Sequence, residues 1–107
     1  MDALKASFST VTAGQPIVVT VQGDVDLATN SELASVVRSA LSGTPSAVIL
    51  DLTGLTFLDS SGLRALVSLQ EESEAQGATF ALRHLPRHAR RLLEMTGLLD
   101  SFELEPE

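Results

Sequence analysis

Cysteine is absent from this chain of 107 residues, which excludes disulfide bonds, thiolate zinc sites and thiol nucleophiles. Tryptophan and tyrosine are absent as well, so the chain has few aromatic side chains that could stack on nucleic-acid bases or on sugars. Positive charge is scarce: seven Lys and Arg residues stand against 14 Asp and Glu, for a formal net charge of -7. We expect no direct binding of nucleic acid, and a basic partner is favoured.

Long apolar runs are missing too. No stretch approaches the ~20 consecutive apolar residues of a membrane span. The N-terminal sequence MDALKASFST lacks the basic head and the long apolar core of a signal peptide. We therefore expect no membrane span and a cytoplasmic location. The length and the globular composition predict a single domain over residues 1–107.

The periodic segments predict an α/β protein. The β-branched run Ile17–Val21 is typical of a strand, and the continuous apolar run Ala47–Leu50 is typical of a strand buried on both faces. Asp51 ends that run, and Thr53 with Gly54 predicts a turn. The full set of expected elements comprises strands at 4–11, 16–21, 47–51, 78–82 and 101–104, and helices at about 28–41, 60–75 and 86–97.

Strands that alternate with helices imply right-handed crossovers. The first two strands are close enough in the sequence to form an antiparallel hairpin. We predict a mixed, mostly parallel sheet of about five strands, with three or more helices packed mainly on one face.

The stretch at 47–67, AVILDLTGLTFLDSSGLRALV, places Asp59 and Ser60 at the start of a helix. The first N–H groups of a helix lack partners, and the helix dipole makes that end positive. Asp59 or Ser60 can cap these donors, and a phosphate on Ser60 would be held by the same donors. Gly62 indicates that something approaches the backbone closely. An ordinary helix cap and a functional site both remain open interpretations.

Acidic residues follow two of the expected strands. Asp24 and Asp26 come after the second strand, while Asp51 and Asp59 lie at and beyond the end of the central strand. In a parallel sheet these ends meet at one rim, where open α/β folds place their sites. The acids are solvated loop residues, partner-binding residues, or a metal or catalytic site, and the sequence leaves these three interpretations open.

Basic residues gather in one segment, which contains Arg83, His84, Arg87, His88, Arg90 and Arg91. We interpret it as the solvated outer face of a helix, because the acidic remainder of the chain and the lack of aromatic residues oppose nucleic-acid binding. His84 and His88 have the i, i+4 spacing of a metal pair, but Pro86 interrupts a helix between them.

The common catalytic motifs are not supported. A serine nucleophile needs a base within reach, and the two histidines lie in the basic segment. The glycine-rich phosphate motifs GxGxxG and GxxxxGK[ST] are absent. We therefore expect that the protein is not an enzyme and that it has no cofactor and no metal site.

Three motifs together resemble the STAS domain family, in particular the small stand-alone anti-sigma-factor antagonists of bacteria. They are GDVD at 23–26, LDLTGLTFLDSSGL at 50–63 and PRHARRLLEMTGL at 86–98. The resemblance covers nearly the whole chain. One departure is Asp24, where the family often has a glutamate.

The resemblance implies a regulatory protein that binds an anti-sigma factor, itself a serine kinase of the GHKL type, and so releases a sigma factor. The kinase would phosphorylate Ser60, with Ser61 as the neighbouring alternative, and a serine phosphatase would reverse the modification. The protein would act as a monomer or weak dimer. The implied partner-binding residues are Asp24, Asp26, Asp59, Ser60, Ser61, Gly62, Leu63 and Arg64.

Two other functions remain open. The same fold without a working switch serves as a scaffold or as an accessory subunit of a larger complex, including transport machinery. Alternatively, the acidic rim belongs to a small nucleotide-binding protein.

Overall fold

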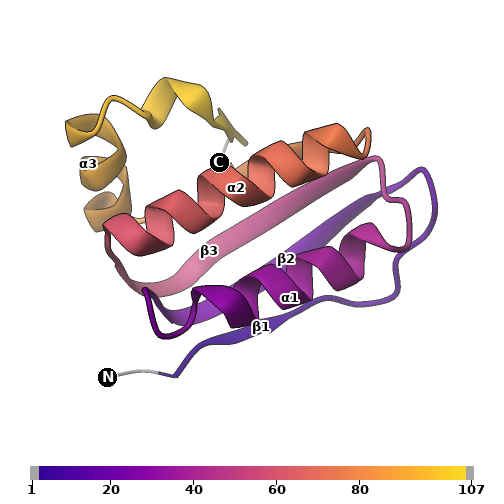
Figure 1. Cartoon of the computed structure of the whole chain (residues 1–107), viewed down its shortest axis with the longest axis horizontal. Helices are drawn as coiled ribbons and strands as arrows, with labels where there is room; N and C mark the ends of the chain where they lie inside the picture. Colours follow the sequence, from indigo (N-terminus) through magenta and orange to yellow (C-terminus); the bar gives the residue numbers. More distant parts are fainter. Residues whose placement is uncertain (1–2, 106–107) are drawn as a thin grey trace.

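Residues 3–105 are described by a computed structural model, in which five strands and three α-helices follow the predicted order (Figure 1). The strands are β1 (Lys5–Ser7), β2 (Pro16–Val25), β3 (Ala47–Leu58), β4 (Thr79–Arg83) and β5 (Glu103–Leu104). The helices are α1 (Asn30–Leu41), α2 (Ser60–Ala75) and α3 (Arg87–Met95), and a short 3₁₀ helix at Leu99–Ser101 precedes β5.

The five strands form one sheet in the order β1-β2-β3-β4-β5. β1 is antiparallel to β2, and the other neighbours are parallel. α1 and α2 lie side by side on one face of the sheet, and α3 stands beyond them near the N-terminal end of α2 (Figure 1). The predicted mixed sheet, with its helices mainly on one face, is confirmed.

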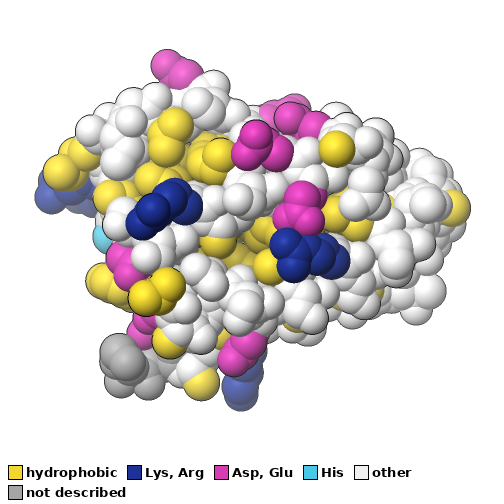
Figure 2. Space-filling view, viewed as in Figure 1, with side chains coloured by type: hydrophobic (Ala, Val, Ile, Leu, Met, Phe, Trp, Pro, Cys, Tyr) yellow, Lys and Arg dark blue, Asp and Glu magenta, His cyan; other side chains and the backbone are white. Residues whose placement is uncertain are grey.

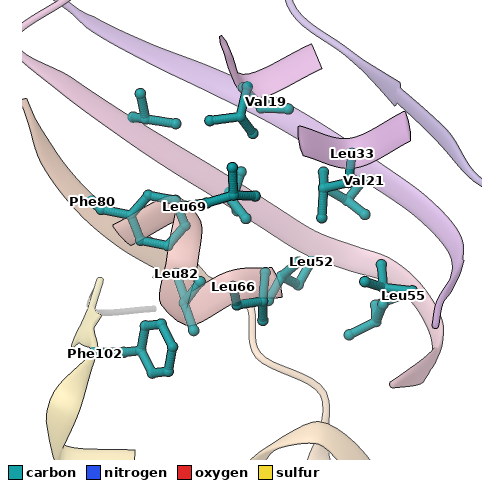
Figure 3. Packing of buried hydrophobic residues seen from close by; sticks show 14 of the residues in the cluster. Val19, Val21, Leu33, Leu52, Leu55, Leu66, Leu69, Phe80, Leu82 and Phe102 are labelled. Atoms are coloured by element: carbon teal, nitrogen blue, oxygen red, sulfur yellow. The ribbon is translucent and has the colours of Figure 1, made fainter. Parts of the chain in front are cut away.

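The core fills the space between the sheet and the two long helices. Val19 and Val21 of β2 point toward α1, and Leu66 and Leu69 of α2 lie close to the side chains of β3 and β4 (Figure 3). At the far edge the rings of β4 Phe80 and of Phe102 pack with centroids 6.4 Å apart. This packing fixes α2, and therefore its first turn, against the sheet.

The central strand is buried, but helices cover only one of its faces. Val48 and Leu50 belong to the core under the helices. Ile49 points to the opposite face because side chains alternate along a strand. There it lies in register with Val18 and Ala81, and it is 6% exposed although it is not part of the core cluster. Neighbouring strands therefore bury Ile49, and the predicted burial of the central strand on both faces is confirmed, although helices cover only one of them.

β3 also runs seven residues past Asp51, where a turn was predicted. Thr20 pairs with Asp51 and Gln22 pairs with Gly54, so β3 contains an extra residue at this point. The turn-forming residues Thr53 and Gly54 thus lie at a β-bulge, which uses the same backbone freedom. Because β4 ends opposite Asp51, the rest of β3 pairs with β2 alone.

The first strand is shorter than predicted, at Lys5–Ser7 instead of 4–11. The chain then leaves the sheet, and the N–H of Gly14 donates to the carbonyl of Thr44 at 2.9 Å. This hydrogen bond ties the β1–β2 connection to the loop between α1 and β3, so the connection cannot continue the hairpin.

Truncation of a core residue of α2 tests this packing. Leu66 is 1% exposed, so we expect Leu66→Ala to lower the free energy of unfolding by about 2–5 kcal/mol, measured by urea denaturation. Met95→Ala, at a position that is 78% exposed, is the control and should change it by less than about 0.5 kcal/mol. Equal losses in the two variants would contradict the assigned core.

Candidate functional site

The start of α2 is capped by Asp59, not by Ser60. The Oδ1 atom of Asp59 accepts a hydrogen bond from the N–H of Gly62 at 2.9 Å, and the carbonyl of Asp59 accepts from Leu63 N at 2.9 Å. Ser60 is the first residue of the helix and is exposed. Its hydroxyl makes no hydrogen bond with residues 3–105.

Gly62 is buried where the first turn of α2 meets the end of β2. A Cβ atom at this position would collide with the carbonyl oxygen of Val25 and with the side chain of Leu58. The close approach predicted at Gly62 is therefore made by the protein's own backbone. Leu63, which is 3% exposed, belongs to the core beneath the helix start.

The loop between β2 and α1 is organised by Asp26. Its Oδ1 atom accepts hydrogen bonds from Ala28 N at 2.9 Å and from Thr29 N at 3.2 Å. The hydroxyl of Thr29 donates to the carbonyl of Asp24 at 2.8 Å. Asp26 remains partly exposed, so its carboxylate both holds the loop and reaches the surface.

Asp24 lies within β2, one residue before its end, and not after the strand as predicted. It is 7% exposed, and its Oδ1 atom accepts a hydrogen bond from the hydroxyl of Thr56 at 2.6 Å. This bond joins β2 to the part of β3 that β4 does not reach. The structure therefore brings Asp24, Asp26 and Asp59 to the same end of the sheet, with Asp24 mostly below the surface.

Asp51 does not belong to this group, because β3 continues to Leu58. It pairs in register with Arg83, and its Oδ1 atom accepts from the backbone N–H and the hydroxyl of Thr53 at 3.0 and 2.7 Å. Burial acts to raise the pKa of Asp51, but the Thr53 hydrogen bonds and the charges of His84 and Arg83 outweigh it, so the pKa is lowered. The prediction that Asp51 lies on the acidic rim is wrong.

Ser61 is partly exposed and Arg64 is exposed, and both line a groove between α1 and α2. Leu27, in the loop after β2, lines the same groove and is 76% exposed. Phe57, in register with Asp24 near the end of β3, is 48% exposed. The sequence reasoning missed both apolar residues. The signal for Leu27 was an apolar residue inside a polar loop. Spacing gave no signal for Phe57, because it lies two residues after buried Leu55 and the register of β3 shifts between the two.

The basic segment divides into a loop and a helix. α3 begins at Arg87, after Pro86, so the predicted break between His84 and His88 is confirmed. The arginines of α3 are exposed while Ala89 and Leu93 are buried, which is the pattern of a solvated outer face. Within residues 3–105 no group of three His, Asp or Glu side chains is placed to hold a metal ion. In the same range no helix combines the length and the apolar character that crossing a membrane requires.

The family model of the STAS domain matches residues 7–107 of the chain. The chain belongs to the STAS domain family. This STAS domain is 29% identical over 87 residues to the anti-sigma-F factor antagonist RsfB of Mycobacterium tuberculosis, covering 81% of this chain and 70% of RsfB.

Solved structures agree on the fold. An anti-sigma factor antagonist from Mycobacterium paratuberculosis superposes with a TM-score of 0.82 at 26% identity, covering 99% of this STAS domain and 88% of that chain. The Bacillus cell fate determinant SpoIIAA in its phosphorylated form superposes with a TM-score of 0.69 at 21% identity, covering 96% and 93% of the two chains. At the latter identity the likeness shows the fold alone.

A pair of variants separates the cap from the neighbouring serine. We expect Asp59→Ala to lower the free energy of unfolding by about 0.5–2 kcal/mol, because the N–H of Gly62 loses its acceptor. Ser60→Ala is the matched control and should change it by less than about 0.5 kcal/mol in the same urea titration. A loss at Ser60 as large as that at Asp59 would assign the cap to the serine.

The lowered pKa of Asp51 predicts a pH-dependent contribution to stability. The ionised carboxylate is favoured in the folded state, so its contribution is fully present above about pH 4, the range of an unfolded Asp, and is lost as the pH falls through the lower folded pKa. Asp51→Asn should therefore be less stable than wild type at pH 7, and the difference in urea midpoint should shrink toward pH 2. A difference that does not depend on pH would contradict this account.

Proposed function

We propose that this STAS domain is an anti-sigma factor antagonist, which binds an anti-sigma factor and thereby releases a sigma factor. Family membership supports this, together with the similarity to RsfB and to the M. paratuberculosis structure, both of which are anti-sigma factor antagonists. The chain would act as a binding protein and as the substrate of a kinase, and not as an enzyme.

The observation that carries the proposal is the exposed Ser60 hydroxyl at the start of α2. The partner would be an anti-sigma factor that is also a serine kinase of the GHKL type, and it would phosphorylate Ser60. A serine phosphatase would restore binding. Ser61 is the neighbouring alternative, but it is less exposed than Ser60 and faces the groove between α1 and α2.

Electrostatics explains how such a modification would switch binding. A phosphate adds about -1.5 to -2 charges beside Asp59 and Asp26, on a chain whose net charge is already -7. Like charges brought together at an interface oppose association by several kcal/mol. The cap of α2 does not use the Ser60 hydroxyl, so the fold tolerates the phosphate. The switch would therefore act by repulsion and steric blockage, without refolding.

Burial divides the implied partner surface into two groups. Asp26, Asp59, Ser60, Ser61 and Arg64 reach the surface and would contact the partner directly. The other three residues, Asp24, Gly62 and Leu63, are buried and would support the surface from below. We propose that the protein acts in the cytoplasm as a monomer or weak dimer.

Phosphorylation with purified components tests the proposal. The wild-type protein is incubated with ATP and each GHKL-type anti-sigma factor encoded in the same genome, and the modified residue is identified by mass spectrometry. We expect one of these kinases to bind the unmodified protein and to phosphorylate Ser60. Ser60→Ala should bind this kinase but resist modification, whereas Ser61→Ala, the matched control, should still be modified.

Ser60→Asp completes the same experiment. We expect it to bind the kinase at least about tenfold more weakly than wild type, with an unchanged circular dichroism spectrum. Modification at another residue, or unfolding of Ser60→Asp, would overturn the proposed switch.

A further inference from the structure

A groove of about 460 Å³ runs between α1 and α2, beginning beside the proposed phosphorylation site. Its walls carry short side chains, with Ala34 on α1 and Ala65 and Ser68 on α2, and buried Leu69 lies at its base. The space-filling view shows hydrophobic atoms in a hollow between two groups of Lys and Arg atoms, on the face formed by these helices (Figure 2). This volume lies within the range that ligand-binding clefts of proteins span.

Leu27 lines the groove, and its side chain is exposed to solvent. The loop that carries it is fixed by the hydrogen bonds from Ala28 N and Thr29 N to Asp26. Leu27 is nevertheless 76% exposed. Because hydrogen bonds already hold the loop, a partner that covers Leu27 would not have to order the backbone that carries it.

The charge along the groove differs at its two ends. Arg38 and Glu72 form an ion pair at 2.8 Å across the end away from Ser61. The other ion pair within residues 3–105 is between Arg83 and Glu105, which leaves Arg64 without an acidic partner. A free guanidinium beside an apolar hollow is complementary to a segment that carries an apolar side chain next to a carboxylate.

We propose that the groove binds such a segment of the anti-sigma factor, with the apolar side chain against Leu27 and the carboxylate on Arg64. This inference rests on the proposed function, since it takes the anti-sigma factor as the occupant. The groove is continuous with the switch, because Ser61 lines it and Ser60 precedes Ser61.

The spacing of Arg64 adds a step to the switch. Ser60 and Arg64 are four residues apart on α2, so they lie on one face of the helix. A phosphate on Ser60 would attract the Arg64 guanidinium through a charge-assisted hydrogen bond. The carboxylate of the bound segment would then lose its partner, in addition to the repulsion at the helix start.

A variant of Leu27 tests the groove, and a variant of the equally exposed Met95 is its control. Leu27→Ser is compared with Met95→Ser, because the parent side chains are 76% and 78% exposed and Met95 lies on α3, outside the groove. Binding is measured calorimetrically against the anti-sigma factor that binds the unmodified protein in the preceding experiment. We expect Leu27→Ser to weaken binding about tenfold or more, and Met95→Ser to leave it unchanged.

Two further variants examine charge and space. Arg64→Gln should weaken binding about tenfold and reduce its dependence on salt, because one charge pair is lost. Ser68→Trp, at an exposed position of the wall, should block the groove without disturbing the core. Circular dichroism verifies that each variant is folded.

Together, these measurements separate a failure of the proposed function from a failure of the groove inference. If no anti-sigma factor binds the wild-type protein, both the proposed function and the groove inference are wrong. If the wild type binds and Ser60→Asp does not, but Leu27→Ser, Arg64→Gln and Ser68→Trp bind as the wild type does, the groove inference alone is overturned. Weakening by Met95→Ser equal to that by Leu27→Ser would also overturn it.

Discussion

The contact between the first turn of α2 and the end of β2 determines the geometry of the site. Because Gly62 has no side chain, the backbone of α2 can approach the carbonyl of Val25, and a Cβ atom would prevent this approach. Asp59 fixes the same turn through its bond to Gly62 N. The β2–α1 loop begins directly after Val25, so this one contact places that loop beside Ser60. The surface assigned to the partner exists only while these two backbones touch.

The site also depends on a part of the sheet that is only two strands wide. β3 passes the end of β4 and continues with β2, and bulges at two points change the register of the pair. The bond between Asp24 and Thr56 joins the strands in this extension. α3 packs against β3 here, where His88 Nε2 lies 3.2 Å from the carbonyl oxygen of Leu55. The otherwise unpaired edge of β3 is thereby partly covered, as edge strands generally require.

Hydrophobic periodicity was sufficient to predict the order of the elements and the start of α2 at Ser60, because both depend on local sequence. It failed where tertiary pairing overrides local signals. Thr53 and Gly54 have the composition of a turn, but pairing with β2 converts them into part of a bulged strand, and this moves Asp51 away from the site. The groove beside Leu27 arises from the way α1 and α2 pack together, which no single segment of the sequence encodes.

The structure assigns two adjacent residues at the start of α2 to different tasks. Asp59 accepts the capping hydrogen bond, while the side chain of Ser60 is exposed and makes no hydrogen bond with residues 3–105. Natural selection can therefore exchange the residue at position 60 without first compensating for a loss of stability. A lineage that abandons the proposed regulation, or acquires a kinase of different specificity, could retain the same scaffold, so the proposed switch and the fold could evolve independently.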